Sequence, residues 1–112
     1  MDRALKNKEA LLQILDELSK GSNSDLLDAR TQLLADEEKE IYALFFIGWA
    51  EDRYIHNLMF HFAMKEGQVW IYENNTDYLV HEGLMNLGVK KEDIIFAWEA
   101  FPNVESLEAA VA

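Results

Sequence analysis

Three histidines are the side chains of this sequence best suited to acid–base or metal chemistry near neutral pH: His56, His61 and His81. Successive side chains of a strand point to opposite faces, so the spacing of His56 and His61 predicts that they point away from each other. His81 precedes Glu82 on an expected helix, but this segment lacks the second histidine of a zinc-protease helix. We therefore expect no metal site and no cofactor.

Other catalytic motifs are missing from the sequence. The four serines lie outside any Gly-x-Ser-x-Gly motif, and the five glycines are too widely separated to form a phosphate-binding loop. The chain has no cysteine, which excludes disulfides and thiolate ligands. Acidic residues are so abundant that a pair of carboxylates carries no information. The sequence therefore predicts no catalytic residue and a protein that is not an enzyme.

The charge is strongly negative, at −11 from 21 acidic and 10 basic residues. The only adjacent basic pair is Lys90-Lys91, which Glu92-Asp93 follows at once, whereas nucleic-acid binding needs clustered lysine and arginine. Direct DNA binding is not expected. No segment is long and apolar enough for a membrane span, and the start of the chain lacks a signal peptide, so a cytoplasmic location is expected.

Three consecutive antiparallel strands are predicted between residues 41 and 72. Ile41–Trp49 is a continuous apolar run, which favours a strand buried on both faces. Tyr54–Met64 follows as the second strand, and the turn Lys65–Gln68 leads into the third, Val69–Tyr72. Both faces of Tyr54–Met64 carry apolar groups, so any face that helices leave uncovered is expected to bind a partner and to cause self-association.

Helical signals flank these strands. Asp2–Lys20 has its leucines in one stripe, with Lys20 and a glycine suited to a helix end. Leu26–Ala35 is compatible with a helix or a strand, and we prefer a strand because a four-stranded meander results.

A second helix is expected to follow the meander. Asn75 or Thr76 is suited to cap its start, and Gly88 to end it. Ile94–Trp98 is predicted to be a last strand, and Glu99–Ala112 a tail that docks as a short helix or a strand. The predicted fold is a single α+β domain over residues 1–112. It has an antiparallel sheet, made of a meander of about four strands plus a C-terminal strand, with the N-terminal helix and the second helix packed on it.

One ordered set of residues forms a recognisable pattern: Gly48, Trp49, His61, Gly67, Trp70, Ile71, Thr76, Gly88, Val89, Asp93 and Ile94. With this set the sequence resembles the XisI-like family, named for the fdxN element excision controlling factor. The resemblance runs from about Leu11 to the C-terminus. The chain departs from the family pattern at Ala63 and at Glu99-Ala100-Phe101 and Val104, which suggests a diverged paralogue.

The resemblance implies a compact α+β fold and a cytoplasmic accessory role in programmed excision of a DNA element. It also implies a companion, XisH, whose family resembles nucleases. Our first hypothesis is a non-enzymatic homo-oligomer that binds such a basic protein partner, with Glu37, Glu38 and Glu40 as candidate contacts. The alternative is a small-ligand-binding protein or enzyme with a pocket near His61, Trp70 and Trp98. The three tryptophans, Trp49 among them, are expected to pack in a core or interface.

Overall fold

The computed structural model describes residues 2–20 and 28–100 of the 112-residue chain. Its centre is a five-stranded sheet with the strand order β1-β2-β3-β4-β5. The elements are α1 (Arg3–Lys20), β1 (Asp28–Asp36), β2 (Ile41–Ala50), β3 (Arg53–Lys65), β4 (Gln68–Asn74), α2 (Val80–Asn86), the 3-10 turn η1 (Lys91–Asp93), β5 (Ile94–Phe96) and α3 (Ala97–Ala100). Strands β1 to β4 are antiparallel, and β5 is parallel to β4. The predicted α+β class is confirmed.

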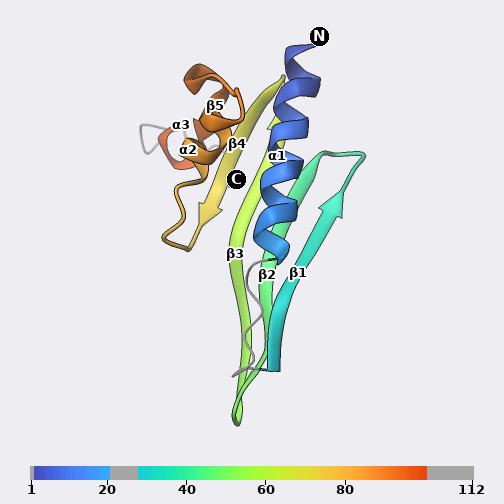
Figure 1. Ribbon diagram of the computed structural model, residues 1–112, viewed down its shortest axis with the longest axis vertical. Coiled ribbons are helices and arrows are strands. Elements are labelled where there is room, and N and C mark those ends of the chain that lie inside the picture. The colour runs from blue at the N-terminus through green and yellow to red at the C-terminus, as the bar shows by residue number, and fades with distance from the viewer. Residues whose placement is uncertain (1, 21–27, 101–112) are drawn as a thin grey trace, which may run out of the picture.

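Helix α1 forms because its leucine and isoleucine side chains recur at helical spacing and can be buried together on one side. Leu11, Ile14 and Leu15 are almost fully buried against the sheet. They belong to one core cluster with Tyr42, Leu44, Phe60, Phe62, Ile71 and the α2 residues Val80 and Leu84. Figure 1 shows α1 lying along the sheet. The predicted N-terminal helix is therefore confirmed.

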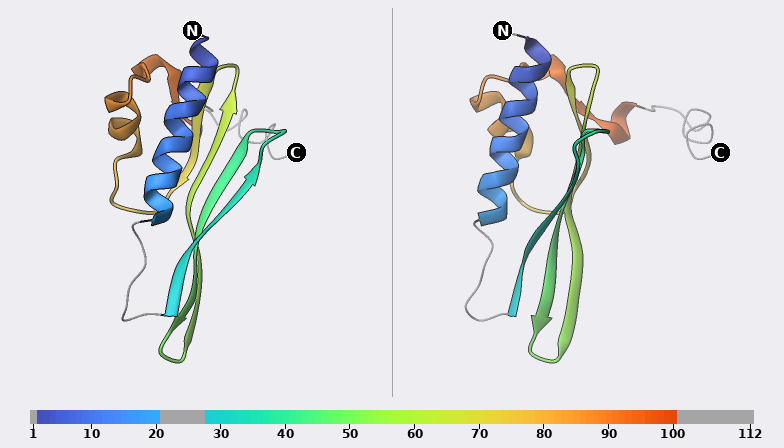
Figure 2. Two further views of the ribbon diagram at one scale, coloured as in Figure 1. Left: turned by 45° about the vertical axis from the view of Figure 1, so that its right-hand side comes forward. Right: turned by 90° about the vertical axis from the view of Figure 1, so that its right-hand side faces the viewer.

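Among the described residues, the two longer helices cover one side of the sheet. Helices α1 and α2 lie on that side, whereas the short α3 follows β5 toward the opposite side (Figure 2, right). In β2, Tyr42 and Leu44 are completely buried, whereas Ile41 and Trp49 on the opposite face are 39% and 45% exposed. The prediction that β2 is buried on both faces is therefore wrong, because the apolar run reflects a second, aromatic surface instead of a second helical layer.

Strand β1 confirms the preference for a strand over a helix, although Leu26 and Leu27 lie outside the described residues. The turn between β3 and β4 is where it was predicted, with Lys65 paired to Gln68. Together these strands form the expected meander.

Helix α2 begins later than predicted. Its N-cap position is Leu79, without a side-chain hydrogen bond, so the assignment of Asn75 or Thr76 as the cap is wrong. The polar side chains order the preceding turn instead, where the Thr76 hydroxyl accepts a hydrogen bond from the Tyr78 amide at 3.1 Å. The helix ends at the predicted place, because the amides of Gly88 and Val89 bond back to Met85 and Leu84 in the pattern of a Schellman motif.

The last strand is shorter than predicted. Pairing between β4 and β5 ends at Ile71 and Phe96, next to an irregularity in the pairing of β4 with β3. The chain then turns into α3, so Trp98 lies on a helix and not on a strand. The tail predicted for Glu99–Ala112 lies outside the described residues beyond Ala100. No helix within residues 2–20 and 28–100 has the length and apolar character to cross a membrane.

Candidate functional site

The side of the sheet opposite α1 carries a continuous set of apolar and aromatic side chains, which we call the uncovered face. The strand registers place these residues there: Leu34, Ile41, Ala43, Phe45, Ile47, Trp49, Tyr54, His56, Leu58, His61, Ala63, Trp70 and Tyr72. Among them, Leu34 is 52% and Tyr54 is 56% exposed. Contiguous exposed apolar patches are common at binding surfaces, so this face is the candidate site.

Aromatic rings contact one another across the uncovered face. The ring centroids of Trp49 and Tyr54 are 5.2 Å apart, and those of Phe45 and His56 are also 5.2 Å apart. Such distances are typical of favourable ring pairs, which add about 1 kcal/mol each beyond their burial. The pairs hold large side chains in place on an exposed surface.

His56 and His61 lie on the same face, and the prediction that they point apart is wrong. His56 pairs with Ile47 and His61 with Ala43, which are both on the uncovered side of β2. The register shift between Leu44 and Phe45 adds one residue to β3 and thereby inverts the alternation between the two histidines. They remain four positions of β2 apart, roughly 13 Å at about 3.3 Å per residue, so they do not share a ligand.

Of the predicted cluster, His61 and Trp70 come together and Trp98 does not join them. The rings of His61 and Trp70 lie 4.8 Å and 6.3 Å from the ring of Tyr72. The Lys65 ammonium is 4.3 Å from the Trp70 ring, a cation–π contact. Trp98 contacts Phe96 at 5.1 Å and lines a pocket of about 210 Å³ beside α2.

Trp70 also carries an unusual polar group. Its indole Nε1–H is buried and has no hydrogen-bond partner among the described residues. A buried donor without a partner costs free energy.

The three predicted glutamates do not act alike. Lys8 on α1 forms ion pairs with Glu40 at 3.4 Å and with Glu37 at 3.8 Å. Tyr42 donates a long hydrogen bond of 3.5 Å to Glu37. Glu38 forms no ion pair within the part of the chain that the structure describes, and it is exposed. Of these three glutamates, only Glu38 has no ion pair with a described residue.

This contact network shifts two titrating groups. The pKa of Tyr42 is raised above its ordinary value, chiefly by burial and further by the charges of Glu37 and Glu40. The pKa of Lys8 is also raised, chiefly by the negative charge of ionised Tyr42, with Glu40 and Glu37 adding to it and burial opposing it. The network therefore serves to attach α1 to the β1–β2 turn.

Several residues that carry the family resemblance have a structural role. The buried carboxylate of Asp93 accepts a hydrogen bond of 3.2 Å from Asn7, whose Nδ2 also donates to the Gly67 carbonyl at 2.7 Å. Arg3 adds an ion pair to Asp93 at 3.5 Å. Val89, Ile94 and Ile71 are in the core, and Gly88 ends α2. In contrast, Trp49, His61 and Trp70 lie on the uncovered face, where the core does not explain them.

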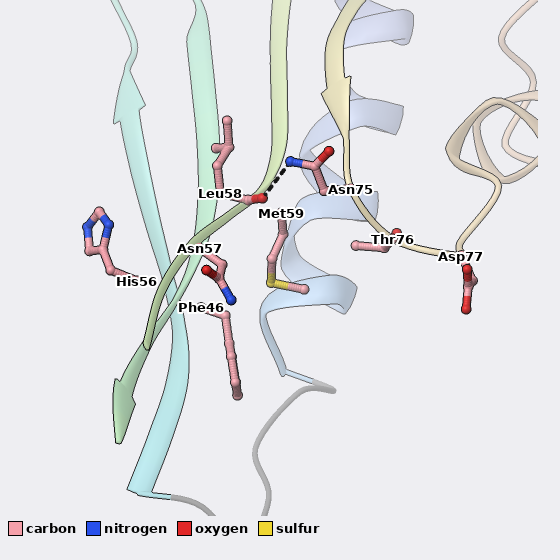
Figure 3. A pocket seen from close by; sticks show the side chains of 8 residues that line it. All are labelled: Phe46, His56, Asn57, Leu58, Met59, Asn75, Thr76 and Asp77. Carbon is pink, nitrogen blue, oxygen red and sulfur yellow. Dashed lines mark hydrogen bonds between the residues drawn. The ribbon is translucent and has the colours of Figure 1, made fainter. Parts of the chain in front are cut away.

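An open groove of about 770 Å³ lies between β3 and the segment that follows β4. Its lining residues are Phe46, His56, Asn57, Leu58, Met59, Asn75, Thr76 and Asp77. Figure 3 shows Phe46 and Met59 on one side of β3, while His56 points away from them. The Asn75 side chain donates a hydrogen bond of 3.0 Å to the Leu58 carbonyl, which joins the segment after β4 to β3 (Figure 3).

The sequence reasoning missed this groove and the inverted alternation. No group of three or more His, Asp or Glu side chains in residues 2–20 and 28–100 is arranged to hold a metal ion. The irregularity could have been suspected from Tyr54–Met64, because apolar residues occupy both faces of this predicted strand.

Taken together, the fold and the surface define a small α+β protein whose sheet is covered by helices on one face and exposes aromatic residues on the other. The chain belongs to the XisI family: the family model described as XisI protein matches residues 1–111. A XisI-like protein from Anabaena variabilis ATCC 29413 is 31% identical, with a TM-score of 0.74 over 83% of this chain and 84% of that chain.

A second solved structure is similar in fold. The fdxN element excision controlling factor XisI from Anabaena variabilis ATCC 29413 has a TM-score of 0.70 at 21% identity, over 87% of each chain. A comparison with curated proteins gave no match. The match to the family model confirms the family resemblance expected from the sequence.

Proposed function

We propose that this protein is a non-enzymatic controlling factor in the excision of a DNA element. It acts in the cytoplasm by binding a basic, nuclease-like companion that resembles XisH. Family membership supports this role, and one similar structure is named as an excision controlling factor. The charge of −11 supports a basic partner, because an acidic surface can cover a groove that binds phosphates.

The observation that carries this proposal is the distribution of acidic side chains at one end of the sheet. The β1–β2 turn with Glu38 and the β3–β4 turn with Glu66 lie at the same end (Figure 1). Asp2, Glu40 and Glu66 line a shallow depression of about 220 Å³ there. Lys8 neutralises part of this charge, and Lys39 and Lys65 in the same two turns offset more of it, but Glu38 and Glu66 form no ion pair with any described residue. We call this region the acidic end.

The test is light scattering after size exclusion, on the protein alone and mixed with its XisH-like companion. A complex with the summed mass is expected. The double variant Glu38→Lys/Glu66→Lys should weaken the complex at least tenfold, and more at low salt than at high salt. The matched control is Glu51→Lys/Asp52→Lys, which changes the charge equally in the β2–β3 turn at the opposite end. Masses that stay separate would contradict the proposal.

A second candidate function rests on the groove next to Phe46. Its volume of about 770 Å³ is within the range of small-molecule sites, which is about 300–1,000 Å³. Asn57, Thr76 and Asp77 offer polar groups to a ligand. This site differs from the pocket expected near His61, Trp70 and Trp98. Ligand screening with detection by amide chemical shifts would support it if the shifts cluster at Phe46 and Asn57, and would oppose it if they scatter.

A further inference from the structure

The uncovered face differs from the rest of the protein in charge. Apart from the rim, its strands present aromatic, aliphatic and histidine side chains. By register, its carboxylates are Asp28 and Asp36 on the edge strand and Glu73 at the end of β4. Arg30 and Lys65 lie on the same side. The face is thus close to neutral in a chain with a charge of −11.

This contrast indicates which partner the face fits. A basic protein gains most from the acidic end and gains little electrostatically from a neutral face. A second copy of the chain has the opposite requirement, because two molecules with a charge of −11 repel each other wherever acidic surfaces meet. The centre of the uncovered face is where two copies can meet without that repulsion.

The size and composition of the face also suit a dimer. With strands about 4.8 Å apart and about 3.4 Å per residue, a sheet of these strand lengths presents roughly 700 Å² on one face. A standard interface buries about 800 Å² per partner. Trp49, Tyr54 and Phe45 are of the types enriched in interface centres. A twofold contact places the same patch of both molecules together.

We infer that the uncovered face binds the same face of a second copy, giving a dimer with the two helical layers on the outside and both acidic ends accessible. This inference does not depend on the proposed function. Ile47 and Phe45 lie at the centre of the contact, between β1 and β3.

The test is light scattering on the purified chain over a hundredfold range of concentration. The expected mass at high concentration is twice the monomer mass of 13.0 kDa. Ile47→Lys places two like charges in the contact and should raise the dissociation constant at least a hundredfold. Leu79→Lys is the control, because Leu79 is 52% exposed on the helical side and should leave the dimer intact.

A second measurement does not require a charged variant to fold. The chain has no cysteine, so Ile47→Cys and Leu79→Cys each introduce a single thiol. The Ile47→Cys thiol should react with iodoacetamide at least tenfold faster in dilute than in concentrated protein, whereas the Leu79→Cys thiol should react equally in both. A monomer at all concentrations would overturn the inference. So would a dimer that survives Ile47→Lys, as expected if the edge of β1 paired instead.

Discussion

The side-chain amide of Asn7 donates a hydrogen bond of 3.2 Å to the carboxylate of Asp93, and so joins two residues 86 positions apart. Both side chains are buried, and Asn7 also holds the carbonyl of Gly67. This one amide therefore connects α1, the β3–β4 turn and the end of η1, directly before β5. The connection positions the acidic end, because Glu66 belongs to the same turn.

Asn7→Ala should lower the free energy of unfolding by about 2–3 kcal/mol, because it leaves a buried carboxylate and a carbonyl without their donor. Denaturant unfolding followed by tryptophan fluorescence measures the change. Arg3→Ala is the control: the Arg3 side chain is 60% exposed, so its ion pair should contribute less than about 1 kcal/mol. A larger loss from Arg3→Ala than from Asn7→Ala would show that the ion pair dominates.

Gly48→Ala should separate β1 from β2. A Cβ at Gly48 would overlap the Asp28 carbonyl oxygen and the Ala29 Cα, and the φ of Gly48 is +150°. Gly48→Ala should lower the free energy of unfolding by about 3 kcal/mol or more, because of steric overlap and backbone strain.

Gly88→Ala provides the comparison, because its φ is +98° but its neighbour is the flexible end of Lys6. We expect Gly88→Ala to lower the free energy of unfolding by about 1 kcal/mol. Hydrogen exchange should show lost protection in β1 for Gly48→Ala alone. If both variants lost the same free energy of unfolding, backbone strain alone, and not the close approach of β1, would explain the need for glycine at position 48.

Alkaline pH should destabilise the protein through Lys8 and Tyr42. Both pKa values are raised in the folded state, so that state retains protons that the unfolded chain releases. The contribution of these two groups to the free energy of unfolding should therefore be constant up to about pH 9.5 and fall above about pH 10. Denaturant unfolding in small pH steps measures this. Tyr42→Phe removes the ionising hydroxyl, so the fall should become shallower, and an unchanged slope would contradict the assignment.

Reversal of single charges should distinguish Glu38 from Glu40. Glu38→Lys should leave the stability within about 0.5 kcal/mol, because Glu38 is exposed and unpaired among the described residues. In the structure the Lys8 ammonium lies 3.4 Å from the Glu40 carboxylate. Glu40→Lys should destabilise the protein, because it replaces this carboxylate with a second ammonium. Thermal unfolding of the two variants side by side gives the result. If Glu38→Lys were the more damaging, the free-charge assignment would be wrong.

Most of the fold could be predicted from local patterns. The stripe of α1, the meander and the end of α2 at Gly88 each depend on neighbouring residues, whose spacing is visible in the sequence. The faces of β3 could not be predicted, because β3 has one extra residue between the partners of Leu44 and Phe45. That residue inverts the assignment of every β3 side chain on one side of it. Trp98 was misplaced for a related reason, since the length of β5 depends on its partner β4.

The candidate site was harder to predict than the fold. Aromatic content indicated an exposed apolar face, and the exposed side chains of Leu34, Trp49 and Tyr54 form one. The sequence could not show that Lys8 pairs with Glu37 and Glu40 and leaves Glu38 free, because that contact joins a helix to a distant turn. Nor could it show that Trp98 lies beside α2 and apart from His61.

The proposed control of a nuclease-like companion is tested most directly by the affinity of the XisH-like protein for DNA, measured by fluorescence anisotropy with and without this protein. We expect the affinity of the XisH-like protein for DNA to fall at least tenfold when this protein is added. The Glu38→Lys/Glu66→Lys variant should not lower that affinity, whereas the Glu51→Lys/Asp52→Lys variant should lower it as the unmodified protein does. An affinity for DNA that does not change at any concentration of the added protein would contradict the proposal.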